Sequence, residues 1–284
     1  MKKIYILFCL FILVTTQAQP QDSLFVWKAG VMIHKQSIKP ADMDSITFKR
    51  PVLNPNGINI AGPNITDIDG NTYQSVTNCG LTFTKQNLNV SKYSDGTPIP
   101  QVQNASAWAI LTTGAWCYYE NNTANGSIYG KLYNWYAVAG IYDAASATNL
   151  ALRKKLAPTG WHVPTDAEWS LLINCLDPNA NGGSTTPNVA GGKMKATGTI
   201  QSGTGLWESP NTSATNESGF TGLPAGFRSN SGAFGNIGND SRFWSSSENN
   251  TSSAWRRFLD RTNGSVSRSD HDKKLGYSVR CLRY

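Results

Sequence analysis

The sequence has no cysteine pair at the close spacing of a zinc ribbon or a thioredoxin-type redox motif. Its histidines are equally sparse: the chain has three, His34, His162 and His271, which lie far apart and fall in no nucleophile or metal-ligand motif. These absences remove the common signatures of metal, redox and nucleophilic catalysis. We therefore expect a protein that is not an enzyme and that needs no cofactor.

Long hydrophobic runs are also missing, apart from one at the N-terminus. Residues 4–14 form an apolar run of eleven residues after Lys2 and Lys3, and Ala18 provides a small residue before a cleavage point. This pattern is typical of a signal peptide and is too short to span a bilayer. Cys9 precedes Leu10 and not a small residue, which argues against a lipid anchor. We predict a signal peptide at 1–18 and a mature chain without a transmembrane segment. The periplasm, the cell surface and the extracellular space remain open as destinations.

Charged residues are scarce, at 15% of the chain, while glycine and asparagine are abundant. This composition favours short strands joined by turns over long helices. Residues 24–27 and 45–48 alternate like strands within a short N-terminal β segment at 19–50. Proline and asparagine concentrate in a predicted linker at 51–65. The main domain is therefore predicted at 66–284.

Local patterns predict two main helices and a hairpin in this domain. Thr165 and Glu168 form a capping box before a helix whose apolar residues, Trp169, Leu172, Ile173 and Leu176, recur on one face. The same spacing predicts a second helix through Leu132, Trp135, Tyr136 and Ala139. Asn263 and Gly264 are typical of a hairpin turn, here between strands at 255–261 and 265–268. Alternation of Tyr277, Val279 and Cys281 predicts a last, half-buried strand.

Eight segments in this order resemble the Fibrobacter succinogenes major paralogous domain, which is found in exported proteins of Bacteroidetes and Fibrobacteres. They are QNL (86–88), YSDG (93–96), GAWC (114–117), YGKLYNWYAV (129–138), GWHVPTDAEW (160–169), GFTGLPAGFR (219–228), FWSSSE (243–248) and SVRC (278–281). The resemblance implies an α+β, C-type-lectin-like fold shared with formylglycine-generating enzymes, with two main helices and short, mostly antiparallel strands. Those enzymes hold copper on a cysteine pair, but no cysteine lies between Cys175 and Cys281. The resemblance thus implies a non-enzymatic branch.

Four cysteines remain after cleavage, and export permits them to form disulfides. Of the three possible arrangements we favour Cys79 with Cys117 and Cys175 with Cys281. Free buried thiols are the alternative for the second pair.

Two further patterns have competing interpretations. Residues 177–182 resemble the opening of a calcium loop, but Asn188 occupies the position of the required glutamate, which favours a helix-terminating loop and leaves calcium as an alternative. Most aromatic side chains should form the core. We assign Trp108, Trp135, Trp169 and Trp255 to the core, and Tyr118, Tyr119 and Trp207 to exposed loops.

Positive charge concentrates in the last 29 residues, which hold eight basic and three acidic side chains. Arginine can bind anionic groups through forked hydrogen bonds. We predict a ligand site at Arg256, Arg261, Arg268 and His271, with the loop of Tyr118 and Tyr119 as the alternative place. The partner would be an unknown glycan, an anionic envelope polymer or a protein, and not a nucleic acid. The competing hypothesis is a structural cell-envelope or matrix protein, in which these side chains form a solvated face.

Overall fold

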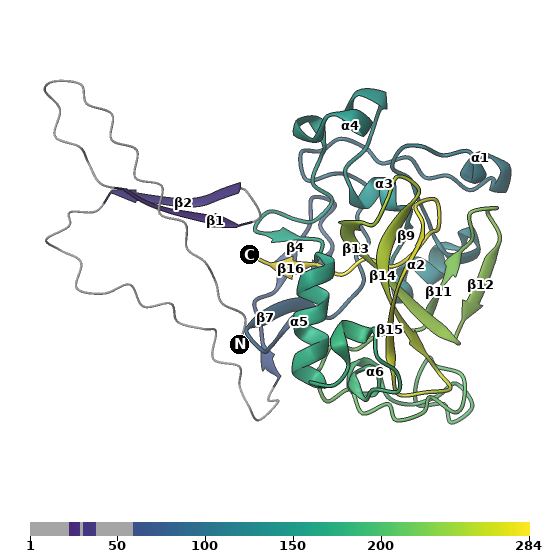
Figure 1. Cartoon of the computed structure of the whole chain (residues 1–284). Coiled ribbons are helices and arrows are strands. Elements are labelled where there is room, and N and C mark those ends of the chain that lie inside the picture. Colours follow the sequence, from purple (N-terminus) through teal and green to yellow (C-terminus); the bar gives the residue numbers. More distant parts are fainter. Residues whose placement is uncertain (1–22, 29–30, 38–58) are drawn as a thin grey trace, which may run out of the picture. The chain divides into compact units, whose positions relative to one another are not determined.

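The computed structural model describes residues 23–28, 31–37 and 59–284 (Figure 1). The chain divides into two compact units, Met1–Arg50 and Pro51–Tyr284. In the first unit, β1 (Ser23–Lys28) pairs antiparallel with β2 (Val31–Ser37), which confirms the strand predicted at 24–27. The predicted signal peptide, the strand predicted at 45–48 and most of the predicted linker lie outside the described residues.

One five-stranded sheet of the second unit joins its beginning to its end. Its strands are ordered β10 (Trp161–His162), β16 (Leu282–Arg283), β7 (Leu81–Thr84), β6 (Ser75–Asn78) and β3 (Ile60–Ala61), all antiparallel. Strand β3 lies within the range assigned to the linker, so the sheet begins before residue 66. Two small antiparallel pairs accompany it: β4 (Ile65–Thr66) with β5 (Thr72–Tyr73), and β8 (Trp116–Cys117) with β9 (Leu132–Tyr133).

The second five-stranded sheet carries Arg256, Arg257 and Arg268 of the basic C-terminal segment. Its order is β12 (Phe234–Ile237), β11 (Ala225–Arg228), β13 (Asp240–Glu248), β14 (Ser253–Asp260) and β15 (Val266–Asp272). Only the pair β11–β13 is parallel among these described strands. The hairpin predicted around Asn263 and Gly264 is confirmed as β14 and β15. The α+β class with mostly antiparallel strands is also confirmed.

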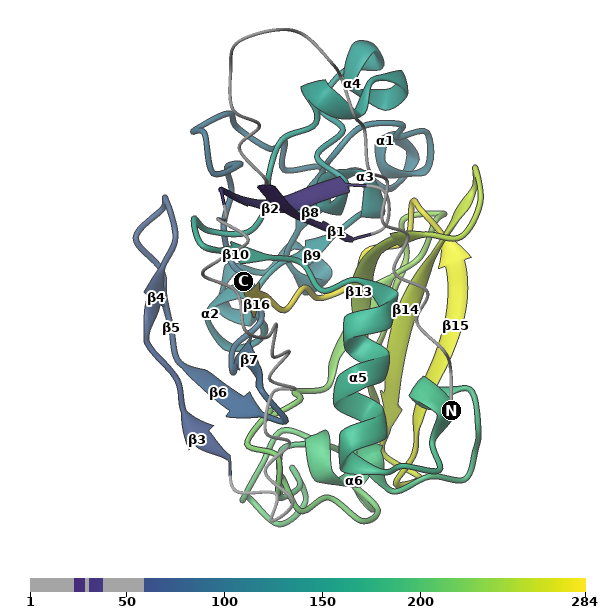
Figure 2. The same ribbon diagram turned by 60° about the vertical axis from the view of Figure 1, so that its left-hand side comes forward.

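The helices are short except for one. They are α1 (Ala105–Ala109), α2 (Thr123–Tyr129), α3 (Trp135–Val138), α4 (Ala144–Thr148), α5 (Asp166–Leu176) and α6 (Ala190–Met194), with 3₁₀ turns at Tyr119–Asn121, Leu150–Leu152 and Asn181–Gly183. The capping box of Thr165 and Glu168 starts α5 as predicted. Trp169, Leu172 and Ile173 are buried, and α5 packs against β13 and β14 (Figure 2).

The second predicted helix is wrong in extent. Leu132 belongs to strand β9, and α3 is only one turn long. Gly140 then turns the chain with a φ of +72°, and a Cβ at this position would lie 1.9 Å from the carbonyl oxygen of Lys154. The apolar residues therefore have helical spacing although they belong to two buried elements, the strand β9 and the single turn of α3.

The predicted last strand is buried on both sides and not on one. Residues 277–281 are all fully buried, because this segment runs between the two sheets. Tyr277 exchanges backbone hydrogen bonds with Tyr133 in β9, and Ser278 bonds to Arg242 and Trp244 in β13. The chain then enters β16, where Leu282 pairs with Phe83.

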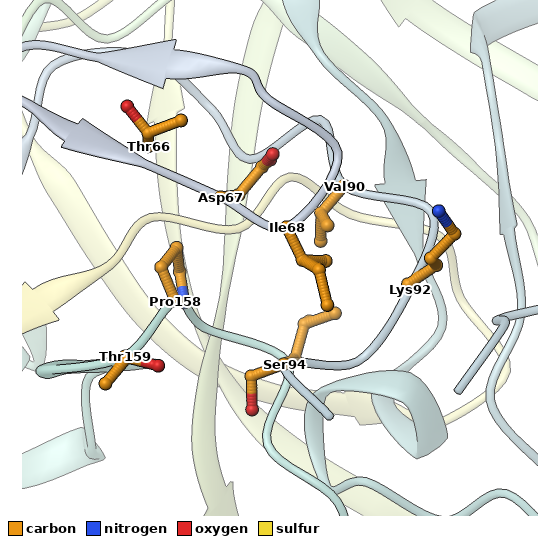
Figure 3. A pocket seen from close by; sticks show the side chains of 9 residues that line it. Thr66, Asp67, Ile68, Val90, Lys92, Ser94, Pro158 and Thr159 are labelled. Carbon is orange, nitrogen blue, oxygen red and sulfur yellow. The ribbon is translucent and has the colours of Figure 1, made fainter. Parts of the chain in front are cut away.

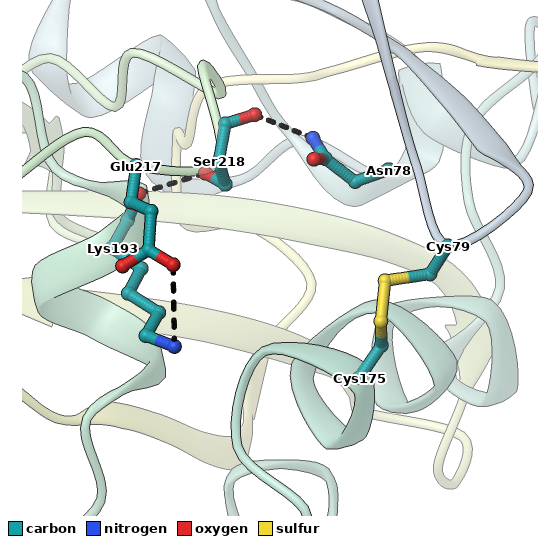
Figure 4. Close-up of a disulfide and its surroundings, with 6 residues drawn as sticks. All are labelled: Asn78, Cys79, Cys175, Lys193, Glu217 and Ser218. Carbon is teal, nitrogen blue, oxygen red and sulfur yellow. Dashed lines mark hydrogen bonds and ion pairs between the residues drawn. A yellow bond between two sulfur atoms is a disulfide. The ribbon is translucent and has the colours of Figure 1, made fainter. Parts of the chain in front are cut away.

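Both predicted disulfide pairs are wrong. The structure joins Cys79 to Cys175 across a Cα–Cα distance of 6.3 Å (Figure 4). Cys79 occupies the turn between β6 and β7, beside the C-terminal end of α5 that carries Cys175. Cys117 and Cys281 are free and buried in two different hydrophobic clusters of the described core. Burial raises the pKa of each of these thiols to about 12, so they remain protonated at neutral pH.

Candidate functional site

Strand register divides the basic hairpin into two faces. Arg256 lies opposite Ser269, and Ala254 lies opposite His271, whereas Arg257 lies opposite Arg268. Because successive side chains of a strand point to opposite sides, Arg256 and His271 share one face and Arg257 and Arg268 share the other. The second face contacts α5. The first face points away from α5. We call it the outer face and define it by the residues Arg242, Arg256, Phe258, Ser267, Ser269 and His271.

Arg268 is part of the packing between the sheet and α5. Its guanidinium binds the Asp166 carboxylate at 2.8 to 3.1 Å, and Arg257 donates to the same carboxylate at 2.8 Å. Burial would raise the pKa of Asp166, but the hydrogen bonds and charges of the two arginines lower it. Arg268 also lies 3.4 Å from the ring centroid of Trp255, which is half-buried and not fully buried as predicted. Arg268 therefore lies on the face that contacts α5 and does not belong to the outer face.

Arg261 is also separated from the predicted site. It follows β14 at the far end of the hairpin, where it hydrogen-bonds to the Asn239 side chain and to the carbonyl of Ser209. Glu208 lies 3.9 Å from its Nε. These contacts hold neighbouring loops together.

The aromatic residues assigned to exposed loops are mostly buried. Tyr119 packs on Phe234, with ring centroids 5.4 Å apart. Trp207 is fully buried, and its indole nitrogen donates to the carbonyl of Gly222 at 3.0 Å. Tyr118 is half-buried and packs edge-on against Trp116. The alternative site at Tyr118 and Tyr119 therefore offers little exposed aromatic surface.

The structure does bring Arg256 and His271 together. Arg256 Nη2 lies 3.3 Å from His271 Nε2, and His271 Nδ1 lies 2.8 Å from the Tyr277 hydroxyl oxygen. A guanidinium can only donate, so Nε2 must accept, and the proton of the neutral ring lies on Nδ1. Burial and the nearby charges of Arg256 and Arg242 lower the pKa of His271 to about 4. At neutral pH the ring is therefore uncharged and orients Arg256.

Arg256 is buried with most of its hydrogen-bonding capacity unused. It is 8% exposed, and within the described part of the chain its Nε and Nη1 have no hydrogen-bond partner. These two nitrogens carry three of the five guanidinium N–H donors. Ser269, opposite Arg256 on β15, also has a buried hydroxyl without a partner among the described residues. Burial lowers the pKa of Arg256 to about 10, so the group stays charged at neutral pH.

A second arginine of the outer face was missed by the sequence analysis. Arg242 binds the Asp240 carboxylate through Nη2 at 2.8 Å and Nε at 3.3 Å. Its guanidinium carbon lies 3.7 Å from the ring centroid of Phe227 and 5.4 Å from that of Phe258. Burial raises the pKa of Asp240 even beside Arg242. The alternation of Asp240, Arg242 and Trp244 along the sequence could have placed Arg242 on one face of a strand. These residues precede the basic segment at 256–284, so the charge count did not include them.

A separate cavity has a volume of about 270 Å³, and Figure 3 shows the side chains around it. It is lined by Thr66, Asp67, Ile68, Val90, Lys92, Ser94, Leu156, Pro158 and Thr159. Asp67 already accepts from the Tyr73 hydroxyl at 2.5 Å, from the Asn71 side chain and from two backbone N–H groups. Lys92 lies 3.2 Å from Asp69. The charged groups around this cavity are therefore used in local structure.

His162 and the possible calcium loop also have structural partners. His162 Nε2 lies 3.0 Å from Glu168, and its ring stacks on Tyr284. The Asp177 carboxylate accepts from the backbone N–H groups of Asn179 and Val189, which favours the helix-terminating loop. In the regions that the structure describes, no group of three His, Cys, Asp or Glu side chains could hold a metal ion.

The fold and the outer face define an α+β domain with a largely buried polar cluster centred on Arg256. The model of the Fibrobacter succinogenes major domain matches residues 76–283, and the chain belongs to this family. No curated protein and no solved structure matches the chain. Among the described residues, no helix has the length and apolar character needed to cross a membrane.

The low pKa of His271 predicts a pH dependence of stability. The folded chain resists protonation of this ring, whereas the unfolded chain binds the proton near pH 6.5. The free energy of unfolding should therefore decrease as pH falls from 6.5 towards 4. Urea denaturation of the wild type and of His271→Gln between pH 7 and pH 4 tests this. The variant should show a shallower decrease, and equal slopes would contradict the assignment.

Proposed function

We propose that the protein is an exported ligand-binding or adhesive module of the bacterial cell envelope, without enzymatic activity or a required cofactor. It recognises an anionic or glycan partner on the outer face of β13, β14 and β15. The observation that supports this most is Arg256, a charged side chain that is buried and has three N–H donors without a partner in the residues that the structure describes. A buried charge without partners costs stability, and such groups concentrate where a ligand supplies the missing contacts.

Export is part of the proposal and rests on the apolar run of residues 4–14 and on Ala18. Mass spectrometry of the protein secreted by a Gram-negative host should find an N-terminus at Gln19. A mature product that retains residues 1–18, or that carries a lipid on Cys9, would contradict it. We also propose a C-type-lectin-like scaffold, on the resemblance of the GWHVPTDAEW and SVRC segments.

The structural alternative also has an observation in its favour. Two of the four basic residues predicted to form the site, Arg261 and Arg268, are used in internal contacts and do not join Arg256. A cell-envelope or matrix protein without a ligand site would show such scattering.

A binding array of glycans and envelope polysaccharides, probed with residues 19–284, separates the two functions. The binding module should retain a subset of anionic polymers, and the signal should decrease at high salt because the interaction is partly electrostatic. Binding to none of the polymers at low salt would favour the structural alternative.

A further inference from the structure

We infer that Arg256 receives a single, singly charged anionic group, and that its natural source is the carboxylate of an acidic sugar residue. This inference rests on the proposed function and specifies the chemistry of its ligand. The site consists of Arg256 and Ser269 as donors, with Arg242 and Asp240 beside them and Phe258 as an apolar neighbour.

The balance of charge sets the charge of the ligand. The site holds two guanidinium groups, on Arg242 and Arg256, and one carboxylate, on Asp240. An Asp240 carboxylate oxygen lies 2.8 Å from Arg242 Nη2, and no described carboxylate contacts Arg256, so the charge of Arg256 has no counter-ion in the described part of the chain. One negative charge would complete the pairing. A phosphate monoester, with nearly two charges, would leave an excess of negative charge in a poorly hydrated place.

The unused donors indicate where the group would bind. Nε and Nη1 of Arg256 and the hydroxyl of Ser269 are buried and have no partner among the described side chains and backbone. Arg256 and Ser269 face one another across β14 and β15, so a single group can contact both. Carboxylate oxygens accept such hydrogen bonds, and charged hydrogen bonds are the stronger ones.

The apolar surroundings favour an anion that is carried on a ring. Phe258 is half-buried, and its ring centroid lies 4.7 Å from the guanidinium carbon of Arg256. Phe227, also half-buried, lies beside Arg242 on the neighbouring strand. Aromatic side chains next to a charged donor suit a pyranose ring, which combines an apolar face with a carboxylate.

His271 is a positioning residue for this site. It accepts from Arg256 Nη2 through Nε2 and is itself fixed by Tyr277, which is fully buried. One end of the guanidinium is thereby held, and Nε and Nη1 are left without partners among the described residues. The donors are set in place before the ligand arrives, which reduces the entropy lost on binding.

The experiment compares matched probes on the mature chain and two variants. Oligomers of galacturonate, glucuronate and mannuronate are titrated by calorimetry against their methyl esters, which keep the ring but lose the charge. Sulfated neutral oligosaccharides and inorganic phosphate are the other anions. We expect at least one uronate series to bind, and the esters to bind about 30-fold more weakly, as the loss of a charged hydrogen bond predicts.

Arg256→Met should lose the same factor in affinity for the uronates. It should keep or raise the melting temperature, because it removes a buried charge that has no counter-ion in contact. Arg261→Gln is the matched control: it removes one positive charge from the same basic segment, and uronate affinity should be unchanged. Sodium acetate, compared with sodium chloride at equal ionic strength, should raise the melting temperature of the wild type but not of Arg256→Met.

The outcomes separate this inference from the proposed function. Tight binding of sulfated sugars or phosphate that depends on Arg256, with weaker binding of uronates, would overturn the carboxylate and keep the binding function. Array binding that persists in Arg256→Met would move the site and also overturn the inference. Absence of binding to every probe and polymer would overturn both. A large loss of melting temperature in Arg256→Met would show that Arg256 has a structural role and would overturn the inference.

Discussion

Replacing Arg280 with alanine should lower the free energy of unfolding by about 5 kcal/mol. This guanidinium is fully buried and donates to the carbonyls of Thr84, Phe220 and Thr221 and to the side chain of Asn87, at 2.7 to 2.9 Å. Its removal leaves four buried acceptors without a donor and opens a cavity beside Phe220. Urea denaturation followed by tryptophan fluorescence measures the loss.

Arg283→Ala provides the matched control for Arg280. Arg283 lies three residues further along, in β16, and is exposed. Its replacement should change the free energy of unfolding by less than about 0.5 kcal/mol, as is usual for surface positions. A loss below about 1 kcal/mol for Arg280→Ala would contradict the burial and hydrogen bonding described for this side chain.

Reducing the disulfide should lower the free energy of unfolding by about 4 to 5 kcal/mol. Cys79 and Cys175 are separated by 96 residues, and the bond removes the entropy that this long loop would have in the unfolded chain. Denaturation with and without dithiothreitol measures the effect. The double variant Cys79→Ser, Cys175→Ser should be as stable as the reduced wild type, and dithiothreitol should not change its stability. If dithiothreitol destabilises the variant as much as the wild type, the stabilising bond is not between these two cysteines.

Local signals predicted the elements of the fold that depend on adjacent residues. The capping box of Thr165 and Glu168 fixes the start of α5, and Asn263 with Gly264 fixes the turn of the hairpin. The disulfide could not be predicted in this way, because it depends on where the turn of Cys79 lies relative to α5. The prediction of the second helix was wrong for a related reason. Leu132 and Trp135 belong to different elements, β9 and α3, and both are buried, so their spacing resembles that of one helical face.

The candidate site was predicted in part. The concentration of basic residues indicated the hairpin of β14 and β15, and Arg256 and His271 do meet on it. The charge count did not separate the two faces of the strands, so Arg268 was included although it binds Asp166. Arg242 could not be found from the basic segment, because it comes from β13 and joins Arg256 only through the pairing of strands.

The position of β16 has a consequence for how the chain is made. This strand consists of residues 282 and 283 and lies between its two partners, β10 and β7, which are synthesised about 120 and about 200 residues earlier. The segment before it supplies Arg280 and fills the space between the two sheets. During synthesis from N- to C-terminus the first sheet therefore lacks this inner strand until residues 282 and 283 emerge. Closure of the domain is therefore a long-range event, and it cannot occur before residues 277–283 have been synthesised.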